Sequence, residues 1–242
     1  MIFTYTDFGI AGPYLGQMQA VLHTWAPQAP VVNLCADVPA FAVRPAAYLL
    51  ASLVPYLPDN GVILGVVDPG VGSERLPLVL RADNRWFVGP DNGLFAVVAG
   101  AARQTAWWRI DWRPAWQSAS FHGRDVFAPV AALLARGEPV PGTAMPSPMV
   151  NPAWPADLPE IIYIDHYGNA MTGIRGERLT AAAHLHVHAT LIPTARVFAA
   201  VPRGQPFCYV NSSGLIEIAV NQGHAGMDLD FQIGTPVTLQ AS

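Results

Sequence analysis

The chain contains no lysine, because all 13 of its basic residues are arginine. A lysine is needed to form a Schiff base with a substrate, to anchor pyridoxal phosphate and to complete a phosphate-binding P-loop. The sequence therefore excludes these three kinds of catalysis. Any chemistry must come from carboxylates, imidazoles, guanidinium groups or the backbone.

Charge and cysteine are also scarce. Only 12% of the 242 residues are charged, and the net charge is -4. A surface that binds nucleic acid needs a basic field, so we expect no nucleic-acid partner. The two cysteines, Cys35 and Cys208, lie far apart in apolar runs, which favours buried free thiols over a disulfide.

Long hydrophobic runs are missing, although 52% of the residues are hydrophobic. No stretch reaches the roughly 18 uninterrupted apolar residues that a membrane-spanning helix needs. The first residues begin a strand and carry no charged region followed by a cleavage site. We therefore expect a soluble, cytoplasmic protein that has no membrane partner. Its length suffices for one large domain or two smaller ones.

Strands and helices alternate in the first part of the sequence. The predicted order is strand 2–6, helix 14–25, strand 31–34, helix 44–56 and strand 61–67. This order is typical of a parallel α/β sheet. Further strands are expected at 76–80 and 86–88, and further helices at 94–101 and 121–135. We predict an α/β N-terminal domain, residues 1–140, in which helices flank a largely parallel central sheet.

Prolines interrupt the chain between residues 141 and 159, which we interpret as a connector between domains. Short strands separated by glycine and proline follow, so residues 160–242 are predicted to form a smaller all-β C-terminal domain. His184, His186 and His188 would share one face of a strand and could chelate a metal. No carboxylate or cysteine lies near them in sequence, so an ordinary strand face is favoured and no metal site is predicted.

Two of the predicted strands end in an aspartate. Asp7 follows the first strand, and Asp68 follows the strand at 61–67, directly before a Pro-Gly-Val-Gly turn. Open α/β sheets bind ligands at the carboxyl ends of their strands, and a carboxylate suits the two hydroxyls of a ribose. Arg75 is close enough in sequence to pair with Asp68. Capping of the local turn is the other interpretation of each aspartate.

Two polar turns stand out in the second half of the chain. Asp165-His166-Tyr167-Gly168-Asn169 follows a predicted strand, and Asn211-Ser212-Ser213-Gly214 separates two others. An asparagine offers a donor and an acceptor to the edge of a purine, and an aromatic ring can cover its face. Taken alone, each segment also has the composition of an ordinary β-turn.

Six ordered motifs, spread over essentially the whole chain, resemble those of the S-adenosylmethionine (SAM) hydroxide adenosyltransferases, hydrolase relatives of the SAM-dependent fluorinase and chlorinase. The motifs are Thr6-Asp7-Phe8-Gly9, Val67-Asp68-Pro69-Gly70-Val71-Gly72 with Arg75, Gly89-Pro90-Asp91-Asn92-Gly93, Phe121-His122-Gly123-Arg124-Asp125-Val126-Phe127, Asp165 with Tyr167-Gly168-Asn169, and Asn211-Ser212-Ser213-Gly214-Leu215-Ile216-Glu217.

The resemblance implies that water or hydroxide displaces methionine from C5′ of SAM and gives adenosine. SAM is then the substrate, no cofactor is needed, and the protein is a homotrimer with sites at subunit interfaces. Asp68, Arg75 and His122 match the family's Asp-Arg-His set and are the expected catalytic residues. Asp7 matches the ribose-binding aspartate.

The same resemblance supplies the other expected substrate-binding residues, which are Phe41, Asp165, Tyr167, Asn169, Phe198, Asn211, Ser212 and Glu217. Arg75 beside Asp68 would make this acid a poor base. We therefore expect Asp68 to orient its neighbours rather than to accept the proton.

The chain also departs from the patterns that it resembles. Gly123 stands where the halogenases carry a serine that helps to hold halide, which favours water as the nucleophile. Gly12 and Gly173 replace an aspartate and an asparagine that are usual in the family, so contacts to the methionine end are not assigned. A halide-using SAM lyase and an adenosine- or SAM-binding module with little turnover remain as alternatives.

Overall fold

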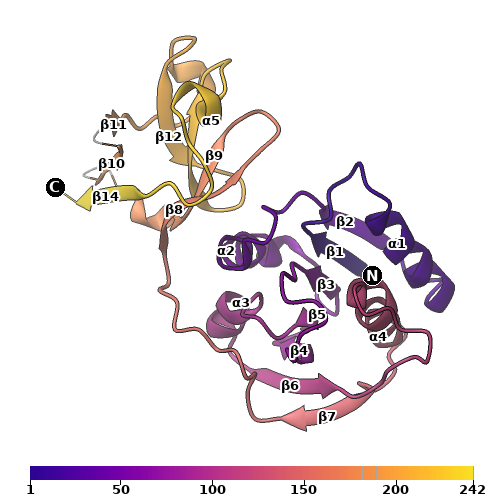
Figure 1. Cartoon of the computed structure of the whole chain (residues 1–242). Coiled ribbons are helices and arrows are strands. Elements are labelled where there is room, and N and C mark those ends of the chain that lie inside the picture. The colour runs from indigo at the N-terminus through magenta and orange to yellow at the C-terminus, as the bar shows by residue number, and fades with distance from the viewer. Residues whose placement is uncertain (181–182, 189, 242) are drawn as a thin grey trace. The chain divides into compact units, whose positions relative to one another are not determined.

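The computed structural model describes residues 1–180, 183–188 and 190–241 (Figure 1). The chain divides into two compact units. The first contains Met1–Leu50 and Tyr56–Trp154, and the second contains Ala51–Pro55 and Pro155–Ser242. The segment predicted as a connector, 141–159, is thus divided between the two units.

A seven-stranded sheet forms the centre of the first unit. Its strands are β1 (Ile2–Thr6), β2 (Val31–Cys35), β3 (Val62–Val66), β4 (Pro77–Ala82), β5 (Arg85–Pro90), β6 (Thr105–Ile110) and β7 (Gly142–Met145). Their order across the sheet is β2-β1-β3-β5-β4-β6-β7. The first four in this order pair in parallel, and β4, β6 and β7 add antiparallel pairs.

The prediction of a largely parallel sheet is wrong, because this sheet is mixed. Parallel neighbours need a long crossover connection, whereas a tight turn joins antiparallel strands. β4 and β5 are joined by Asp83 and Asn84 alone, and Asp83 has a left-handed φ of 49°. Aspartate tolerates this conformation, so the two strands form a hairpin instead of a parallel pair.

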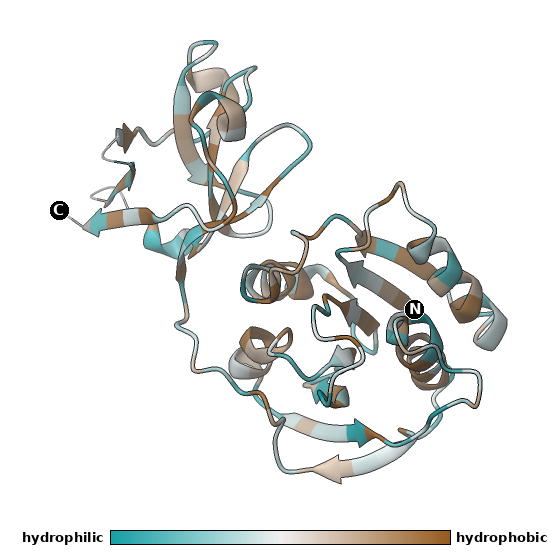
Figure 2. Cartoon of the chain, viewed as in Figure 1, coloured by the Kyte–Doolittle hydropathy of each residue, from teal (hydrophilic) through white to brown (hydrophobic). Residues whose placement is uncertain are grey.

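Helices cover both faces of the sheet, as predicted. They are α1 (Tyr14–Trp25), α2 (Val43–Leu53), η1 (Val54–Tyr56), α3 (Ala96–Ala101), the π-helical η2 (Gly123–Phe127) and α4 (Ala128–Ala135). One core packs α1 and α4 against residues of β1, β3 and β5. Tyr5, which points to the opposite face, donates to the Ala46 carbonyl in α2 at 2.7 Å. Helix α2 is apolar along most of its length (Figure 2).

None of the helices in the described ranges is both long and apolar enough to span a bilayer.

The second unit contains two sheets. Its strands are β8 (Leu158–Ile164), β9 (Ala170–Arg175), β10 (Ala183–Val187), β11 (Thr190–Ile192), β12 (Pro206–Val210), β13 (Leu215–Val220) and β14 (Val237–Ala241). One sheet has the order β12-β13-β9-β8 and the other β11-β10-β14. The prediction of an all-β domain is right only in part, because the unit also has α5 (Ala225–Asp228) and two 3-10 turns, η3 (Gly176–Arg178) and η4 (Phe198–Ala200). These elements are too short to leave a helical period in the sequence.

The single strand expected to carry His184, His186 and His188 is broken at His188. This residue has a left-handed φ of 52°, which ends β10 and starts the turn towards β11. His184 and His186 therefore lie on the strand, and His188 lies in the turn after it. Within the described ranges, no group of three or more His, Cys, Asp or Glu side chains could hold a metal ion.

Both cysteines are free thiols, as predicted. Cys208 on β12 is buried, and burial raises the pKa of its thiol. Cys35 is half-buried at the end of β2 and donates to Asp37 at 3.2 Å. The prediction of a buried thiol is therefore right for Cys208 alone.

Two glycines bring the parallel strands β3 and β5 together. A Cβ added at Gly89 would lie 2.1 Å from the Gly65 carbonyl oxygen and 2.9 Å from the Phe95 ring. No side chain can occupy that space. The close approach lies near the carboxyl end of both strands, next to the loops that follow them.

We expect Gly89→Ala to lower the free energy of unfolding by about 3 kcal/mol, because the added carbon must push the strands apart. Urea unfolding would measure the change. Gly100→Ala in α3 is the matched control, because nothing lies within 4 Å of the added carbon. That substitution should be neutral or stabilise by about 0.5 to 1 kcal/mol. Equal stabilities of the two variants would contradict the close approach.

Candidate active site

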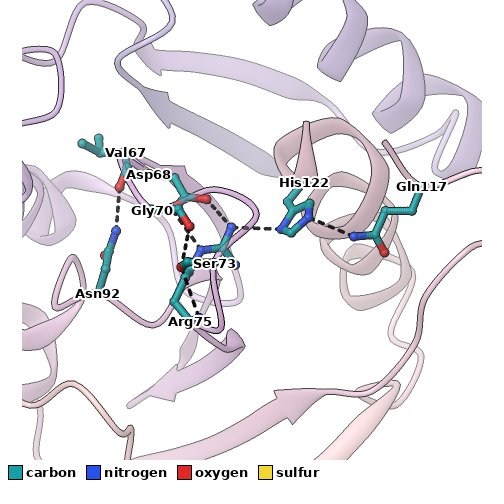
Figure 3. A network of polar contacts seen from close by, with 8 residues as sticks. All are labelled: Val67, Asp68, Gly70, Ser73, Arg75, Asn92, Gln117 and His122. Atoms are coloured by element: carbon teal, nitrogen blue, oxygen red, sulfur yellow. Dashed lines mark hydrogen bonds and ion pairs between the residues drawn. The ribbon is translucent and has the colours of Figure 1, made fainter. Parts of the chain in front are cut away.

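The turn after β3 brings Arg75 back to Asp68. Gly72 has a left-handed φ of 82°, and the backbone N–H and hydroxyl of Ser73 both donate to the Gly70 carbonyl. The Ser73 hydroxyl also accepts from the Arg75 backbone N–H at 3.3 Å. This compact loop fixes the direction in which the Arg75 side chain leaves the backbone (Figure 3).

Arg75 and Asp68 form a two-pronged ion pair. Nε of Arg75 donates to Oδ1 of Asp68 at 2.9 Å, and Nη2 donates to Oδ2. The two side chains are only 8% and 6% exposed. Phe127 covers the guanidinium, with its ring centre 5.2 Å from Cζ of Arg75. Burial and a planar fork make this pair far more rigid than a surface salt bridge.

His122 completes a row of three side chains. Its Nδ1 lies 3.1 Å from Nη2 of Arg75, and its Nε2 lies 2.9 Å from the amide of Gln117 on the opposite side (Figure 3). Burial, and next the positive charge of Arg75, lower the pKa of His122 below its usual range. The imidazole is therefore neutral near pH 7.

The loop before His122 is held by a buried acid. Asp125 in η2 is fully buried and accepts from the Ser118 backbone N–H at 2.8 Å. It also receives two hydrogen bonds from Arg124. The π-helical turn that follows His122 is a kind of distortion that is frequent at functional sites.

Residues of the predicted Gly89–Gly93 motif form hydrogen bonds close to the Asp68 loop. The Asn92 amide donates to the Val67 carbonyl at 2.8 Å, just before Asp68. Asp91 is buried and accepts the backbone N–H groups of Met149 and Val150. Asn92 thus supports the start of the Asp68 loop, and Asp91 holds residues 149 and 150 against the motif.

A cavity of about 520 Å³ opens beside this row. Asp68 and His122 line it together with Asp7 and Phe41, which were both predicted as substrate-binding residues. Asp7 accepts from the Phe41 backbone N–H at 3.0 Å, and burial raises the pKa of its carboxyl. Phe41 has a left-handed φ of 63° and is 74% exposed. A strained backbone and an exposed ring are features that functional sites retain.

The remaining predicted residues lie around a second cavity, of about 560 Å³, in the second unit. Its lining includes all seven of them: Asp165, Tyr167, Asn169, Phe198, Asn211, Ser212 and Glu217. Asp165 holds Asn169 through its backbone N–H at 2.8 Å and its side-chain amide at 3.0 Å. The two polar turns thus border the same cavity. Sequence alone could not distinguish them from ordinary β-turns.

A buried acid lies at the second cavity. Glu217 accepts hydrogen bonds from the Tyr209 hydroxyl and from the Asn211 amide, the latter at 2.7 Å. Burial raises the pKa of Glu217 and also that of Tyr209. Two donors on one carboxylate fix its orientation towards the cavity.

Sequence reasoning missed several residues of these sites. Tyr14 and Arg124 line the first cavity, and Tyr209 lines the second. Tyr209 could not be found from the sequence, because only the β12–β13 pairing places it opposite Glu217. Gln117 left no signal, since its loop has no period and no turn motif.

Two protein-family models match consecutive parts of the chain. The SAM hydroxide adenosyltransferase N-terminal domain matches residues 2–143, and the C-terminal domain of the same family matches residues 159–238. The chain belongs to the SAM hydroxide adenosyltransferase family. It is therefore an enzyme, and both cavities fall within the matched residues.

Individual relatives match over nearly the full length. A protein of Thermus thermophilus named (R)-S-adenosyl-L-methionine hydrolase is 37% identical over 98% of each chain. One of the same name from Salinispora arenicola is 39% identical over 91% of this chain and 90% of its own. The crystal structure of an uncharacterized conserved protein from Thermotoga maritima is 30% identical, covers 99% of both chains and has a TM-score of 0.89.

We expect Asp125→Ala to lower the free energy of unfolding by about 3 kcal/mol or more, because it leaves the partner groups of a buried acid unpaired. Chemical unfolding would measure it. Asp59→Ala is the control, because Asp59 also pairs with an arginine but is 62% exposed. Asp59→Ala should lower the free energy of unfolding by about 1 kcal/mol or less. A similar cost for both variants would show that Asp125 does not hold the loop.

Proposed function

We propose that this chain hydrolyses SAM to adenosine and L-methionine by attack of water or hydroxide on C5′ of the ribose. One observation carries the proposal. Asp68 and Arg75 from the loop after β3 and His122 from a distant segment form one hydrogen-bonded row beside a cavity that Asp7 also lines. Membership of the adenosyltransferase family and the names of the relatives support the same reaction.

The chemistry of SAM makes few demands on the site. The sulfur is a positively charged sulfonium and leaves as a neutral thioether, so no group has to protonate it. Attack forms the O–C5′ bond, the C5′–S electron pair goes to sulfur, and the water loses one proton. The enzyme must orient and partly desolvate one oxygen nucleophile in line with the C5′–S bond. Nothing in this displacement calls for a metal or another cofactor.

Each member of the row has a role that follows from its contacts. Both oxygens of Asp68 accept from Arg75, so Asp68 orients the guanidinium instead of taking the proton. Arg75 supplies positive charge where the nucleophile becomes hydroxide-like. His122 is the proton acceptor, because its lowered pKa keeps it neutral near pH 7.

Different groups of predicted binding residues contact different parts of SAM. Asp7 lines the first cavity with a carboxylate that suits ribose hydroxyls, and the exposed Phe41 ring offers a face to the ligand. We assign the seven residues of the second cavity to the adenosine and methionine parts. The names of the relatives indicate the (R) sulfonium epimer as the substrate.

Halide is a poor candidate for the nucleophile. Gly123 has no hydroxyl, and a Cβ placed there would lie 3.2 Å from the Phe8 ring and 3.5 Å from Val66. This corner of the cavity is thus narrow and apolar. A serine that could hold halide has no space there without movement of Phe8.

We also propose a homotrimer with its sites at subunit interfaces, as the resemblance to the family implies. Exposed aromatic side chains at both cavities support an interface. Phe41 in the first unit is 74% exposed, and Tyr167 in the second unit is 76% exposed. Large apolar groups that remain exposed beside a binding site are typical of surfaces that a partner covers.

The reaction is tested by incubating the purified protein with the (R) or the (S) epimer of SAM, with and without chloride. We expect adenosine and methionine in equal amounts from the (R) epimer, unaffected by chloride, as measured by chromatography. Formation of 5′-chloro-5′-deoxyadenosine would establish the halide reaction instead. Binding of SAM without any product would identify a binding module.

In the same assay, Asp68→Ala and His122→Ala should each lose turnover by about 100-fold or more, the usual contribution of a positioned proton acceptor and its support. Both variants should still bind adenosine in calorimetry, because the ribose and base contacts remain. His23→Ala is the control, since His23 is exposed in α1. Full turnover in both site variants would remove the catalytic assignment.

Mixed assemblies test the shared site. Asp68→Ala and Tyr167→Ala chains, each with its own tag, would be co-expressed and purified through both tags. If a site combines residues of two chains, the mixed trimers contain some sites with both native residues and regain turnover. Native mass spectrometry should show three chains. Mixed assemblies no more active than the separate variants would contradict sites at subunit interfaces.

A further inference from the structure

Gln117 contacts His122 but does not line the first cavity. Its side-chain amide lies 2.9 Å from Nε2 of His122, on the side of the ring opposite to Arg75 (Figure 3). His122 and Asp68 line the first cavity, whereas Gln117 is not part of its lining. Any effect of Gln117 on the reaction must therefore pass through the imidazole.

The contacts of His122 determine where its proton lies. A guanidinium has only donors and keeps its charge in proteins, so Arg75 must donate to Nδ1 of His122. Nδ1 then carries a lone pair and no hydrogen. The single proton of the neutral ring consequently sits on Nε2, which must donate to its own neighbour.

That neighbour is Gln117, which can accept. A carboxamide presents either its oxygen or its NH2 group after a half-turn about its last bond, and the hydrogen-bond network decides which. If the NH2 group donated to Nε2, both ring nitrogens would have to accept, and the ring would be an imidazolate. The structure places the amide nitrogen of Gln117 against Nε2 (Figure 3), so the neutral ring requires a half-turn of the carboxamide that brings its oxygen to the N–H of His122.

We propose that Gln117 is a positioning residue that holds His122 as the neutral tautomer with its proton on Nε2. This inference rests on the proposed hydrolysis. With Nε2 occupied, the Nδ1 lone pair is the only basic position of the ring, and it points towards Arg75 and Asp68. When the attacking water releases its proton, Nδ1 gives up its hydrogen bond from Arg75 and takes that proton, because a protonated Nδ1 can no longer accept from a guanidinium. The imidazolium keeps its Nε2–H bond to Gln117 until it loses the proton to solvent.

The loop that carries Gln117 is fixed independently. The Gln117 backbone N–H donates to the Pro114 carbonyl at 3.1 Å, and the next residue, Ser118, is bound to the buried Asp125. Arg113 also donates to the carbonyls of Ile110 and Trp112. The side chain is thus presented to His122 by a rigid segment, as positioning requires.

The neutral side chain of Gln117 also affects how readily His122 is protonated. Burial has the largest effect on the pKa of His122, and four charged groups also affect it. Arg75 and Asp68 lie in the loop after β3, Arg113 lies in the segment between β6 and η2, and Asp125 lies in η2. A carboxylate at position 117 would add a negative charge against Nε2–H and stabilise the imidazolium. Glutamine fixes the tautomer without this effect, so the ring stays free to accept a proton.

Three variants separate these effects. Gln117→Met removes the acceptor at similar size, Gln117→Glu keeps an acceptor and adds charge, and Gln28→Glu changes an exposed glutamine as the control. Nitrogen-15 NMR of labelled histidine, with His122 assigned by comparison with His122→Asn, reports the proton position and the titration of the ring. The rate of adenosine formation over a range of pH is the second readout.

In the unchanged protein, NMR should show a protonated Nε2 and an unprotonated Nδ1. In Gln117→Glu the titration midpoint of His122, and with it the acid limb of kcat/KM, should rise by about one pH unit. Above that limb this variant should keep most of its turnover. Gln117→Met should populate both tautomers and lower kcat about tenfold, with KM for SAM nearly unchanged, equivalent to one hydrogen bond. Gln28→Glu should match the unchanged protein.

An unprotonated Nε2, or a titration midpoint that does not move in Gln117→Glu, would overturn the inference. Equal losses in Gln117→Met and Gln117→Glu would do the same, because they would indicate a purely structural role. If the tautomer is as stated but the unchanged protein makes no adenosine, the proposed function fails and the positioning of His122 stands. The NMR measurement therefore tests the tautomer and the activity measurement tests the hydrolysis, so the two hypotheses can be rejected independently.

Discussion

The first site depends on the hydrogen bonds that Arg75 makes. Its planar guanidinium bonds to both oxygens of Asp68 and to Nδ1 of His122, so one side chain joins two distant parts of the chain. Only an arginine has enough donors in one plane for this arrangement. The pair is buried, which removes the screening by water that weakens surface ion pairs. The glycine turn before Arg75 and the Phe127 ring hold the group in place.

The sheet explains why two acids border the same cavity. β1 and β3 are parallel neighbours, and Thr6 lies opposite Val66 in their register. Asp7 and Asp68 follow these positions, so both leave the sheet at its carboxyl edge. The negative charge of Asp68 contributes to the raised pKa of Asp7, which reflects their closeness. Open α/β sheets bind ligands at this edge because the loops there diverge.

The elements that sequence predicted well are those with a strong local pattern. The helix predicted at 14–25 is α1, and the strand predicted at 61–67 contains β3. The errors arose where pairing between distant segments, or the backbone angle of a single residue, decides the structure. β7 forms in a proline-rich segment because it pairs with β6, and His188 ends β10 through a single backbone angle. Neither the direction of β4 nor the presence of α5 leaves a periodic signal.

The sequence by itself determined the family, the absence of lysine chemistry and the two groups of polar loops. These follow from residue identity and order, which do not depend on folding. The contact of Arg75 with both Asp68 and His122, the bond from Tyr209 to Glu217 and the place of Gln117 behind the imidazole were decided by the tertiary structure alone. A hydrogen bond depends on distances of a few tenths of an ångström between groups that lie far apart in sequence, and only the packed fold sets them.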